Sequence, residues 1–299
     1  MRKYWLFGYF VASLSITACV DEVYLDLPTI EPKLVLTAHF TAGEELKAFI
    51  SLSQLLTAQN PPQLPAGVVT LKEANGRPFD TLVRDSTPGG RVFWRSRKPL
   101  TAGVLYTIIA DFLNYPTATA SDSIPSGISD LSLILKKDSI RTVEDTGGVR
   151  ILRVPVRVEI GDLPAQHRYF AFGFQHELKK KDAPQQERRP SSFLANGRTL
   201  ALTYNTPENL FLLNENYWND GRKILEVEVV IPYRPNEEIP FRLWLEWRTL
   251  SEAYYRYHLS LATQGSPLSD PDALFNNVQG GYGNFSGFAR LQQSAELPP

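Results

Sequence analysis

Short segments in which apolar and polar residues alternate recur along this chain, and they constrain its fold more than any other feature. Clear examples are residues 33–40 (KLVLTAHF), 48–53 (AFISLS) and 104–112 (VLYTIIADF). A period of two residues places every second side chain on one face, as in a β-strand with one buried face. The dipeptide Asn75-Gly76, between two such segments, favours a tight hairpin turn. The pattern predicts an all-β fold.

The first part of the chain has the strand spacing of a sandwich. Further strands are expected at residues 67–73 (GVVTLKE), 79–83 and 91–95 (RVFWR), separated by Gly- and Pro-containing turns. About seven short strands at this spacing are typical of two packed antiparallel sheets. We therefore predict a β-sandwich domain over residues 32–125.

A polar Ser/Pro/Gly stretch at residues 121–129 predicts a domain boundary. A second, mainly antiparallel β domain is expected over residues 126–299. Pro155 interrupts one of its strands and predicts an edge strand or a β-bulge. Residues 179–189 (KKKDAPQQERR) indicate a solvated loop, with a lipid-headgroup patch as the sharper alternative. The expected strands of this domain lie at residues 130–137, 149–159, 169–177, 199–204, 223–232 and 240–247.

One segment of the second domain has helical rather than strand periodicity. Residues 249–264 (TLSEAYYRYHLSLATQ) predict the only helix, with Thr249 and Glu252 as a capping box. Leu250, Ala253, Tyr254, Tyr257 and Leu261 recur at helical spacing and should face the core.

Aromatic residues gather in the last third of the chain. They allow two interpretations: rings packed between helix and sheet, or an exposed stacking platform for a glycan or peptide. The residues concerned are Tyr217, Trp218, Trp244, Trp247, Tyr254, Tyr255 and Tyr257.

Residues 275–287 (FNNVQGGYGNFSG) form the most unusual motif, because glycines and asparagines alternate with large rings. Such a composition does not predict an ordinary strand, and glycine permits a positive φ or a close backbone approach. We expect a structural loop that packs onto the second domain, with Phe275 and Phe285 as anchors. The alternative is that these rings face outward and contact a partner. The candidate residues are Phe275, Asn276, Asn277, Gly280, Gly281, Gly283 and Phe285.

Composition and spacing argue against several kinds of chemistry. The 31 basic and 32 acidic residues give a net charge of −1, which lacks the positive excess typical of nucleic-acid binders. The one cysteine excludes a disulfide scaffold, and the four histidines are scattered without metal-ligand spacing. GxGxxG, P-loop and GxSxG motifs are absent. We expect no cofactor, no metal and no enzyme activity, although a Ser-His-Asp triad can assemble from any positions.

The N-terminal residues have the organisation of a secretion signal. Arg2 and Lys3 precede an apolar stretch at residues 4–16, which is too short to span a bilayer. The sequence Ile16-Thr17-Ala18-Cys19 resembles a bacterial lipobox. We predict a signal peptide at residues 1–18, lipidation of Cys19 with acyl chains such as palmitate, and a tether at residues 19–31. A plain signal peptide with a chance cysteine is the alternative.

Asp21 and Glu22 follow the expected lipidation site directly. The pair resembles the signal that exports Bacteroidota-type lipoproteins to the extracellular face of the outer membrane. The alternative is a solvated tether without an export role.

Several features together resemble those of a known family. They are the lipobox, the KLVLTAHF strand, the segments AGVVTLKEANG and PLTAGVLYTIIADF, the Tyr-rich helix and the 275–285 motif. This is the domain of unknown function 4249 family of Bacteroidota outer-membrane lipoproteins. The N-terminal region also resembles an Ig-like or transthyretin-like sandwich. The family has no established activity. The resemblance implies an accessory role beside TonB-dependent β-barrel receptors.

These observations leave three functions to compare. The first is a lipid-anchored, surface-exposed lipoprotein of the outer membrane that acts as a non-catalytic accessory or binding partner of a TonB-dependent receptor in nutrient uptake. The second is a structural component of envelope assembly, and the third is a surface hydrolase. The first predicts an exposed apolar or aromatic patch and co-purification with a β-barrel, and the second predicts protein partners but no concave pocket. A cleft with perturbed carboxylates or a histidine bonded to a nucleophile would favour the third.

Overall fold

The computed structural model describes residues 31–54, 62–144, 147–161, 163, 169–183, 186–195, 209–218, 223–264 and 273–298. The chain divides into Met1–Glu31 and the compact unit Pro32–Pro299. The predicted signal peptide, Cys19, Asp21, Glu22 and the predicted strand at 199–204 lie outside the described residues. Everything below concerns the unit Pro32–Pro299.

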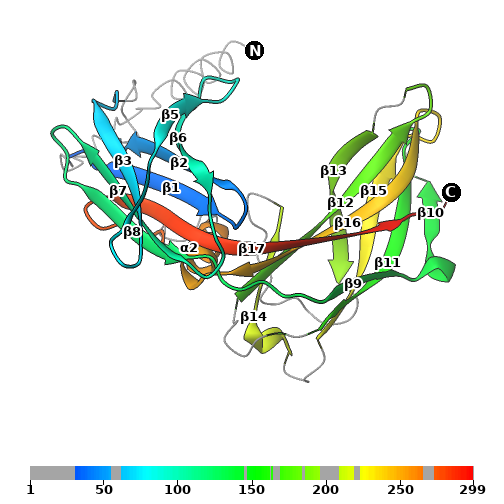
Figure 1. The fold of residues 1–299 in the computed structure, drawn as a ribbon. Helices are drawn as coiled ribbons and strands as arrows, with labels where there is room; N and C mark the ends of the chain where they lie inside the picture. The colour runs from blue at the N-terminus through cyan, green and yellow to red at the C-terminus, as the bar shows by residue number, and fades with distance from the viewer. Residues whose placement is uncertain are drawn as a thin grey trace, which may run out of the picture. The chain divides into compact units, whose positions relative to one another are not determined.

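The all-β prediction is confirmed: strands dominate the described residues, with one short α-helix (Figure 1). The first region is a two-sheet sandwich. One sheet has the order β4-β3-β7-β8, and the other contains β17-β1-β2-β6-β5. The strands are β1 (Leu34–Phe40), β2 (Glu45–Leu52), β3 (Gly67–Glu73), β4 (Pro78–Thr81), β5 (Val83–Ser86), β6 (Val92–Pro99), β7 (Leu105–Phe112) and β8 (Ala118–Ser123).

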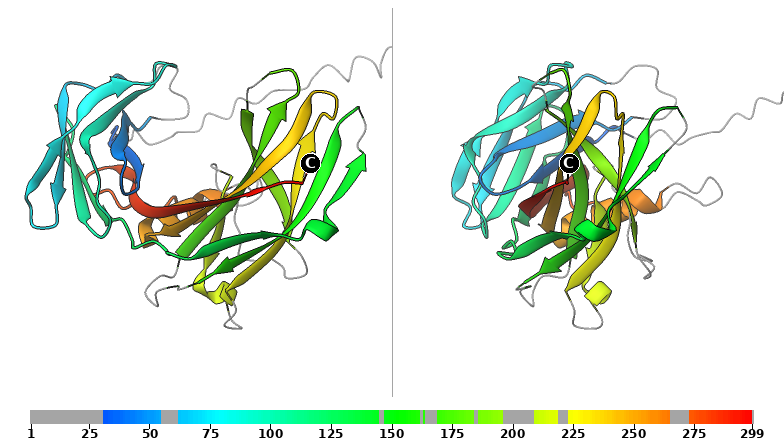
Figure 2. Two further views of the ribbon diagram at one scale, coloured as in Figure 1. Left: turned by 45° about the vertical axis from the view of Figure 1, so that its right-hand side comes forward. Right: turned by 90° about the vertical axis from the view of Figure 1, so that its right-hand side faces the viewer.

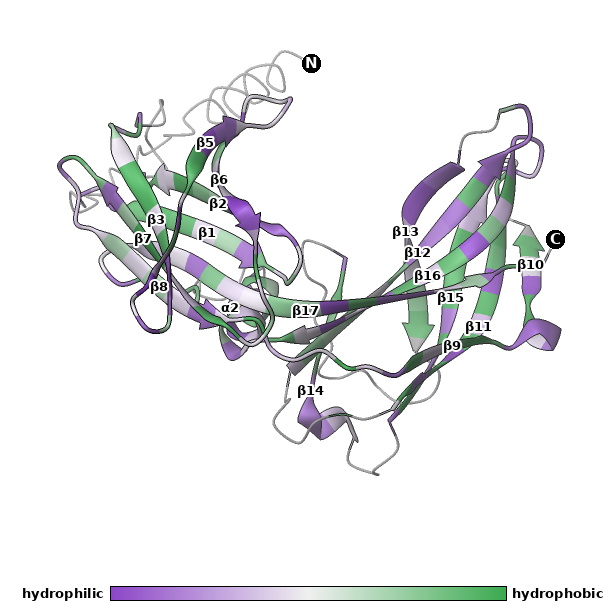
Figure 3. Cartoon of the chain, in the orientation of Figure 1, coloured by the Kyte–Doolittle hydropathy of each residue, from purple (hydrophilic) through white to green (hydrophobic). Residues whose placement is uncertain are grey.

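The alternation of apolar and polar residues in the sequence corresponds to an alternation of buried and partly exposed side chains in the strands. Every second side chain of β1, from Leu34 to Phe40, is buried in the first hydrophobic core. The predicted Asn75-Gly76 turn is present between β3 and β4, with Gly76 at φ 76° and its N–H donating to the carbonyl oxygen of Glu73. Figure 3 shows the corresponding exchange of hydrophobic and hydrophilic positions along the strands.

The second region is also built from strands. Its elements are β9 (Leu131–Leu135), η1 (Lys137–Ser139), β10 (Arg141–Glu144), β11 (Arg150–Ile160), β12 (Tyr169–Lys180), β13 (Gln186–Ala195), β14 (Phe211–Asn214), η2 (Glu215–Trp218), β15 (Ile224–Tyr233), β16 (Glu238–Leu250), α2 (Glu252–Thr263) and β17 (Tyr282–Glu296). Strand β13 pairs with β12 through residues 186–191 and with β15 through residues 192–195. It therefore joins the two groups of strands that enclose the second core.

Pro155 does not mark an outer edge, in contrast to the prediction. Strand β11 pairs with β15 along one side, and β10 and β9 share the other side. The carbonyl oxygen of Pro155 accepts from the N–H of Lys136, between the residues that pair with β10 and those that pair with β9. The missing N–H of proline thus faces the gap between two short strands, where no ladder bond is required.

Two further predictions need correction. Residues 179–189 are largely not a loop, because β12 and β13 continue as a hairpin in which Lys179 lies opposite Gln186. Helix α2 begins at Glu252 and is capped by Ser251, whose side chain accepts from the N–H of Tyr254. Thr249, the expected cap, lies in β16, where it pairs with Ala289 of β17 and is buried.

Strand β17 connects the two regions. Residues 282–287 pair in parallel with β1, and residues 288–296 pair antiparallel with β16. The two further views in Figure 2 show β17 (red) beside β1 (blue), as the register requires. The motif predicted as a loop therefore ends as a strand, since β17 begins at Tyr282.

Candidate functional site

The glycines of the 275–287 motif allow β17 to lie directly against its neighbours. Gly283 has φ 123°, and a Cβ atom there would collide with the carbonyl oxygen of Leu36 in β1. Gly280 has φ 75°, and its Cβ would meet the carbonyl oxygen of Thr117. Gly281 has no positive φ, yet a side chain there would meet the carbonyl oxygen of Leu34. These close approaches require glycine, so a composition unusual for a strand is compatible with one.

Asparagine side chains stabilise the entry into β17. The Asn277 side-chain amide donates to the carbonyl oxygen of Phe285 at 2.8 Å and accepts from the Phe285 N–H at 3.0 Å. The Asn277 side chain thus makes the two backbone hydrogen bonds with Phe285 that a neighbouring strand would otherwise make. Asn276 stabilises the preceding turn, where its Oδ1 accepts from the N–H of Val278 and its Nδ2 donates to the carbonyl oxygen of Gly281.

Phe285 is buried, but in the first core rather than in the second domain as predicted. Its ring lies 4.4 Å from that of Phe40, between centroids. The parallel pairing with β1 explains the difference, because it brings this part of β17 into the sandwich. Phe275 is only half-buried; its N–H donates to Ser260 Oγ, and Arg256 lies 5.9 Å from its ring. Only one of the two expected anchors therefore packs in a core.

A histidine and a serine meet at the pairing of β1 with β17, with His39 Nδ1 2.9 Å from Ser286 Oγ. Asn284 Nδ2 donates to the Ala253 carbonyl, so its Oδ1 faces Ser286, and the Ser286 hydroxyl donates to it at 2.5 Å. A hydroxyl has a single proton, so His39 Nδ1 is the donor to Ser286. In this arrangement His39 Nδ1 cannot accept the Ser286 proton, and Ser286 is fully buried.

An aspartate holds the next part of the strand. Asp122 Oδ2 accepts from the N–H of Gly287 at 2.9 Å. Burial raises the pKa of Asp122 above its ordinary value, while hydrogen bonds from Ser251 and from the Gly287 backbone act in the opposite direction. The contact links β8 to β17.

The aromatic cluster of the last third does not form a single exposed platform. Trp247, Tyr254 and Tyr255 are buried, as the core interpretation predicts for them. Tyr217 and Trp218 lie in η2 and pack against the second core. The ring of Trp244 is half-buried on the other face of β16, with the guanidinium groups of Arg188 and Arg242 at 4.3 and 5.7 Å from its centroid. Trp244 Nε1 donates to Glu177 at 3.2 Å.

A cavity of about 730 Å³ lies at one end of the first sandwich, and sequence reasoning missed it. Its walls come from both sheets and from residues 63–66. Counted by residue, most of the lining is apolar, with Ile50, Val69, Leu82, Val92, Trp94 and Phe112 as the principal side chains, but about half of its accessible surface is polar. The local signal in the sequence is the run Pro61-Pro62-Gln63-Leu64-Pro65, whose prolines disfavour a central strand.

The polar side chains of this cavity are Gln63, Thr81 and Arg84, and none of the described lining residues is Asp, Glu, His, Cys or Ser. Its volume lies within the range typical of small-molecule sites. The geometry therefore suits binding of a small molecule with apolar and polar parts, and it provides no general base within the described lining.

Two kinds of site are absent from the described residues. No group of three or more His, Cys, Asp or Glu side chains is placed there to hold a metal ion. The described part of the chain also contains no helix of the length and apolar character needed to cross a bilayer.

Comparison with known proteins identifies the family. No curated protein matches the chain significantly. A chain from a solved chaperone–tip adhesin complex of CFA/I fimbriae biogenesis is similar at 8% identity, over 74% of this chain and 84% of that chain, with a TM-score of 0.25; this likeness is too weak to support an argument. The profile of the domain of unknown function DUF4249 matches residues 20–294. The match covers nearly the whole sequence, and the chain belongs to the DUF4249 family.

Proposed function

We propose that this protein is a lipid-anchored lipoprotein of the outer membrane, displayed at the extracellular face, that acts as a non-catalytic binding module. Its partner is a TonB-dependent β-barrel receptor, and its role is accessory to nutrient uptake. The observation that carries the binding function is the cavity of about 730 Å³ in the first sandwich. A purely structural envelope component has no need of such a site.

The anchor is supported by the N-terminal residues alone. Ile16-Thr17-Ala18-Cys19 has the order of a lipobox, and Cys19 is the only cysteine. Several acyl chains contribute about 0.8 kcal/mol for each buried CH₂ group, which suffices for stable attachment to a bilayer. Asp21 and Glu22 support display at the cell surface.

Two arrangements of the described residues favour binding over hydrolysis. The lining of the cavity offers no described carboxylate or histidine. The His39–Ser286 contact has the wrong proton direction for a nucleophile and its base, and Ser286 is fully buried. A hydrolase would need an accessible nucleophile beside a proton acceptor.

Fractionation tests the anchor. We expect Cys19→Ala to move the protein from the membrane pellet to the supernatant. Thr17→Ala is the matched control, because alanine keeps a small residue in the lipobox, and it should remain in the pellet. Retention of Cys19→Ala after a high-salt wash would contradict lipidation at this residue.

Protease treatment of intact cells tests display. Parent protein should be digested, whereas a double variant with Asp21→Ala and Glu22→Ala should be protected. Equal digestion would show that this pair is not the export signal.

Purification of the tagged full chain from detergent-solubilised outer membrane tests the partner. A β-barrel receptor should co-purify in a constant ratio. Recovery of the lipoprotein without any enriched β-barrel would contradict the accessory role.

A further inference from the structure

We propose that the cavity of the first sandwich binds a single long-chain amphiphile with an anionic head, such as a fatty carboxylate. The chain lies between the two sheets, and Arg84 bonds to the head at the mouth. The proposal rests on the binding function proposed above and gives it a class of ligand.

Apolar and polar surface share the walls about equally, as an amphiphile requires. Trp94 meets Phe112 edge to face, with centroids 5.6 Å apart, at the base of the space between the sheets. Val68, which lines the cavity at the start of β3, is 53% exposed. An apolar chain would cover surface that is otherwise in contact with water.

Arg84 lies on the inner face of its sheet. In the register of β5 with β6 it stands directly opposite Trp94, and opposite residues of an antiparallel pair share one face. Because Trp94 belongs to the first core, Arg84 is on the side of the sheet that lines the cavity, where its side chain is exposed to solvent. It is the only charged side chain among the described residues of the lining.

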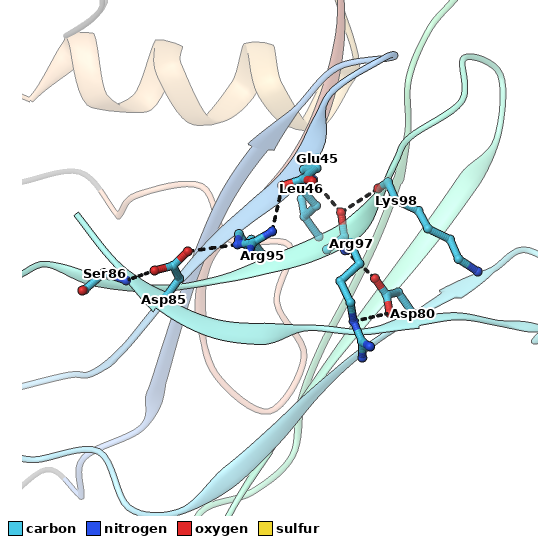
Figure 4. Close-up of polar contacts among 9 residues, drawn as sticks. Glu45, Leu46, Asp80, Asp85, Ser86, Arg95, Arg97 and Lys98 are labelled. Carbon is cyan, nitrogen blue, oxygen red and sulfur yellow. Dashed lines mark hydrogen bonds and ion pairs between the residues drawn. The ribbon is translucent and has the colours of Figure 1, made fainter. Parts of the chain in front are cut away.

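The neighbouring arginines already have carboxylate partners, and Figure 4 shows their network. Arg95 bonds to Asp85 at 2.9 Å and to Glu45 at 3.2 Å, and these residues lie outside the cavity lining. Arg97 approaches Asp80 at 3.7 Å.

Arg84, by contrast, forms no ion pair with any described residue. An anionic head at the mouth of the cavity would supply the missing partner, because a guanidinium binds a carboxylate through two parallel hydrogen bonds.

The negative head also distinguishes two possible sources of an acyl chain. Chains joined to an N-terminal cysteine are held by ester and amide bonds, so they carry no free carboxylate for Arg84. The proposal therefore commits to a free amphiphile rather than to the anchor of the protein itself.

The test uses the full-length chain with Cys19→Ala, so that no acyl chain of the protein competes for the cavity. Dansyl-labelled undecanoic acid is the probe, and its fluorescence should rise and saturate on binding. Hexadecanoate should displace it, and hexadecanol, which has the same chain with a neutral head, should displace it about tenfold less well.

Three variants locate the site. Arg84→Gln should weaken binding of the probe about tenfold. Arg77→Gln, a charge-matched change in the β3–β4 turn, should leave binding unchanged. Ala66→Trp, a bulky residue at the exposed rim, should abolish binding without removing a side-chain contact.

Two results would overturn the proposal. One is the absence of saturable binding to the parent chain. The other is an unchanged affinity of Arg84→Gln for the probe. In that case the charge of Arg84 would serve to protect the edge strand β5 from association with other strands. Neither result bears on co-purification with a receptor, so a failure here and a failure of the proposed function are distinguishable.

Discussion

The two larger hydrophobic cores of the described residues draw on the chain in different ways. The second core is assembled from residues between Ile128 and Leu297. The first core takes its strands from residues 34–124, and then adds Val278 and Phe285, which follow most of the second core in the sequence. The sandwich therefore depends on a strand far from its other strands in the sequence. Contacts of such large sequence separation are closed late and at a high cost in loop entropy.

The cores also differ in how they are closed. The second is filled by interlocking rings: Phe193 lies 4.3 Å from Phe211 and 5.2 Å from Phe172, and Phe172 stacks on Trp247. The first core also contains packed rings, such as Phe40 against Phe285, but in addition Gly283 brings the backbone of β17 against β1 where no side chain would fit. Side-chain packing tolerates adjustment, whereas a close backbone approach does not.

The largest expected effect is at this approach. Gly283→Val should lower the free energy of unfolding by about 5 kcal/mol or more, because it adds a collision with Leu36 to a positive φ. Gly89→Val is the control, because a Cβ atom there would have only Thr87 Oγ1 nearby, at 3.9 Å. This variant should lose less than about 1 kcal/mol of unfolding free energy. Urea unfolding measures both. Similar losses in the two variants would show that the contact with β1 has no special weight.

Removal of the ring that β17 adds to the first core comes next. Phe285→Ala should cost about 3–5 kcal/mol, as for other fully buried phenylalanines. Phe275→Ala, at the half-buried end of the motif, should cost much less. Thermal melts of the two variants compare them. An unchanged melting temperature for Phe285→Ala, together with loss of receptor co-purification, would make this segment a binding site instead.

Protonation of His176 at acidic pH should lower the folding stability of the second region. Burial, and then the charge of Arg189, lower the pKa of His176 to about 4, although Glu238 and Glu187 act in the opposite direction. A folded pKa below the unfolded value means that the unfolded state binds the proton more tightly. The associated stability is complete above about pH 6.5 and is lost as the pH falls towards 4.

His176→Asn isolates this contribution, because its amide can keep a polar partner for Ser191, which lies 2.8 Å from His176 Nδ1. The difference in stability between parent and variant should change by about 2–3 kcal/mol between pH 7 and pH 4. Unfolding curves at several pH values provide the measurement. A difference that does not vary with pH would contradict a neutral, buried His176.

The smallest expected effect separates two neighbouring asparagines. Asn277→Ala removes both hydrogen bonds to the backbone of Phe285 and should cost about 1–3 kcal/mol. Asn276→Ala removes bonds within an exposed turn and should cost about 1 kcal/mol or less. Equal losses in chemical denaturation would mean that Asn277 does not act as a strand partner.

The sequence predicts those elements in which apolar side chains recur at the regular spacing of a strand or a helix. The alternation of β1 and the Asn75-Gly76 turn were sufficient for the fold class, and the helix was displaced only at its start. The identity of strand partners was beyond such reasoning, because the pairing of β17 with β1 joins positions about 245 residues apart and follows no local rule.

The same limit applies to the candidate sites. The glycines of the 275–287 motif predicted a close approach, but composition alone did not indicate that β1 was the neighbour. The cavity was missed because its walls come from residues as distant as Ile50 and Phe112, and each of them fits an ordinary core position by itself.

Strand β17 completes the first core. Hydrogen exchange of Phe285→Ala, followed by mass spectrometry of peptides, tests this role. We expect loss of protection in β1, β2 and β7, with parental protection in β11 and β15. Loss of protection confined to the second region, with unchanged exchange in β1 and β7, would contradict it.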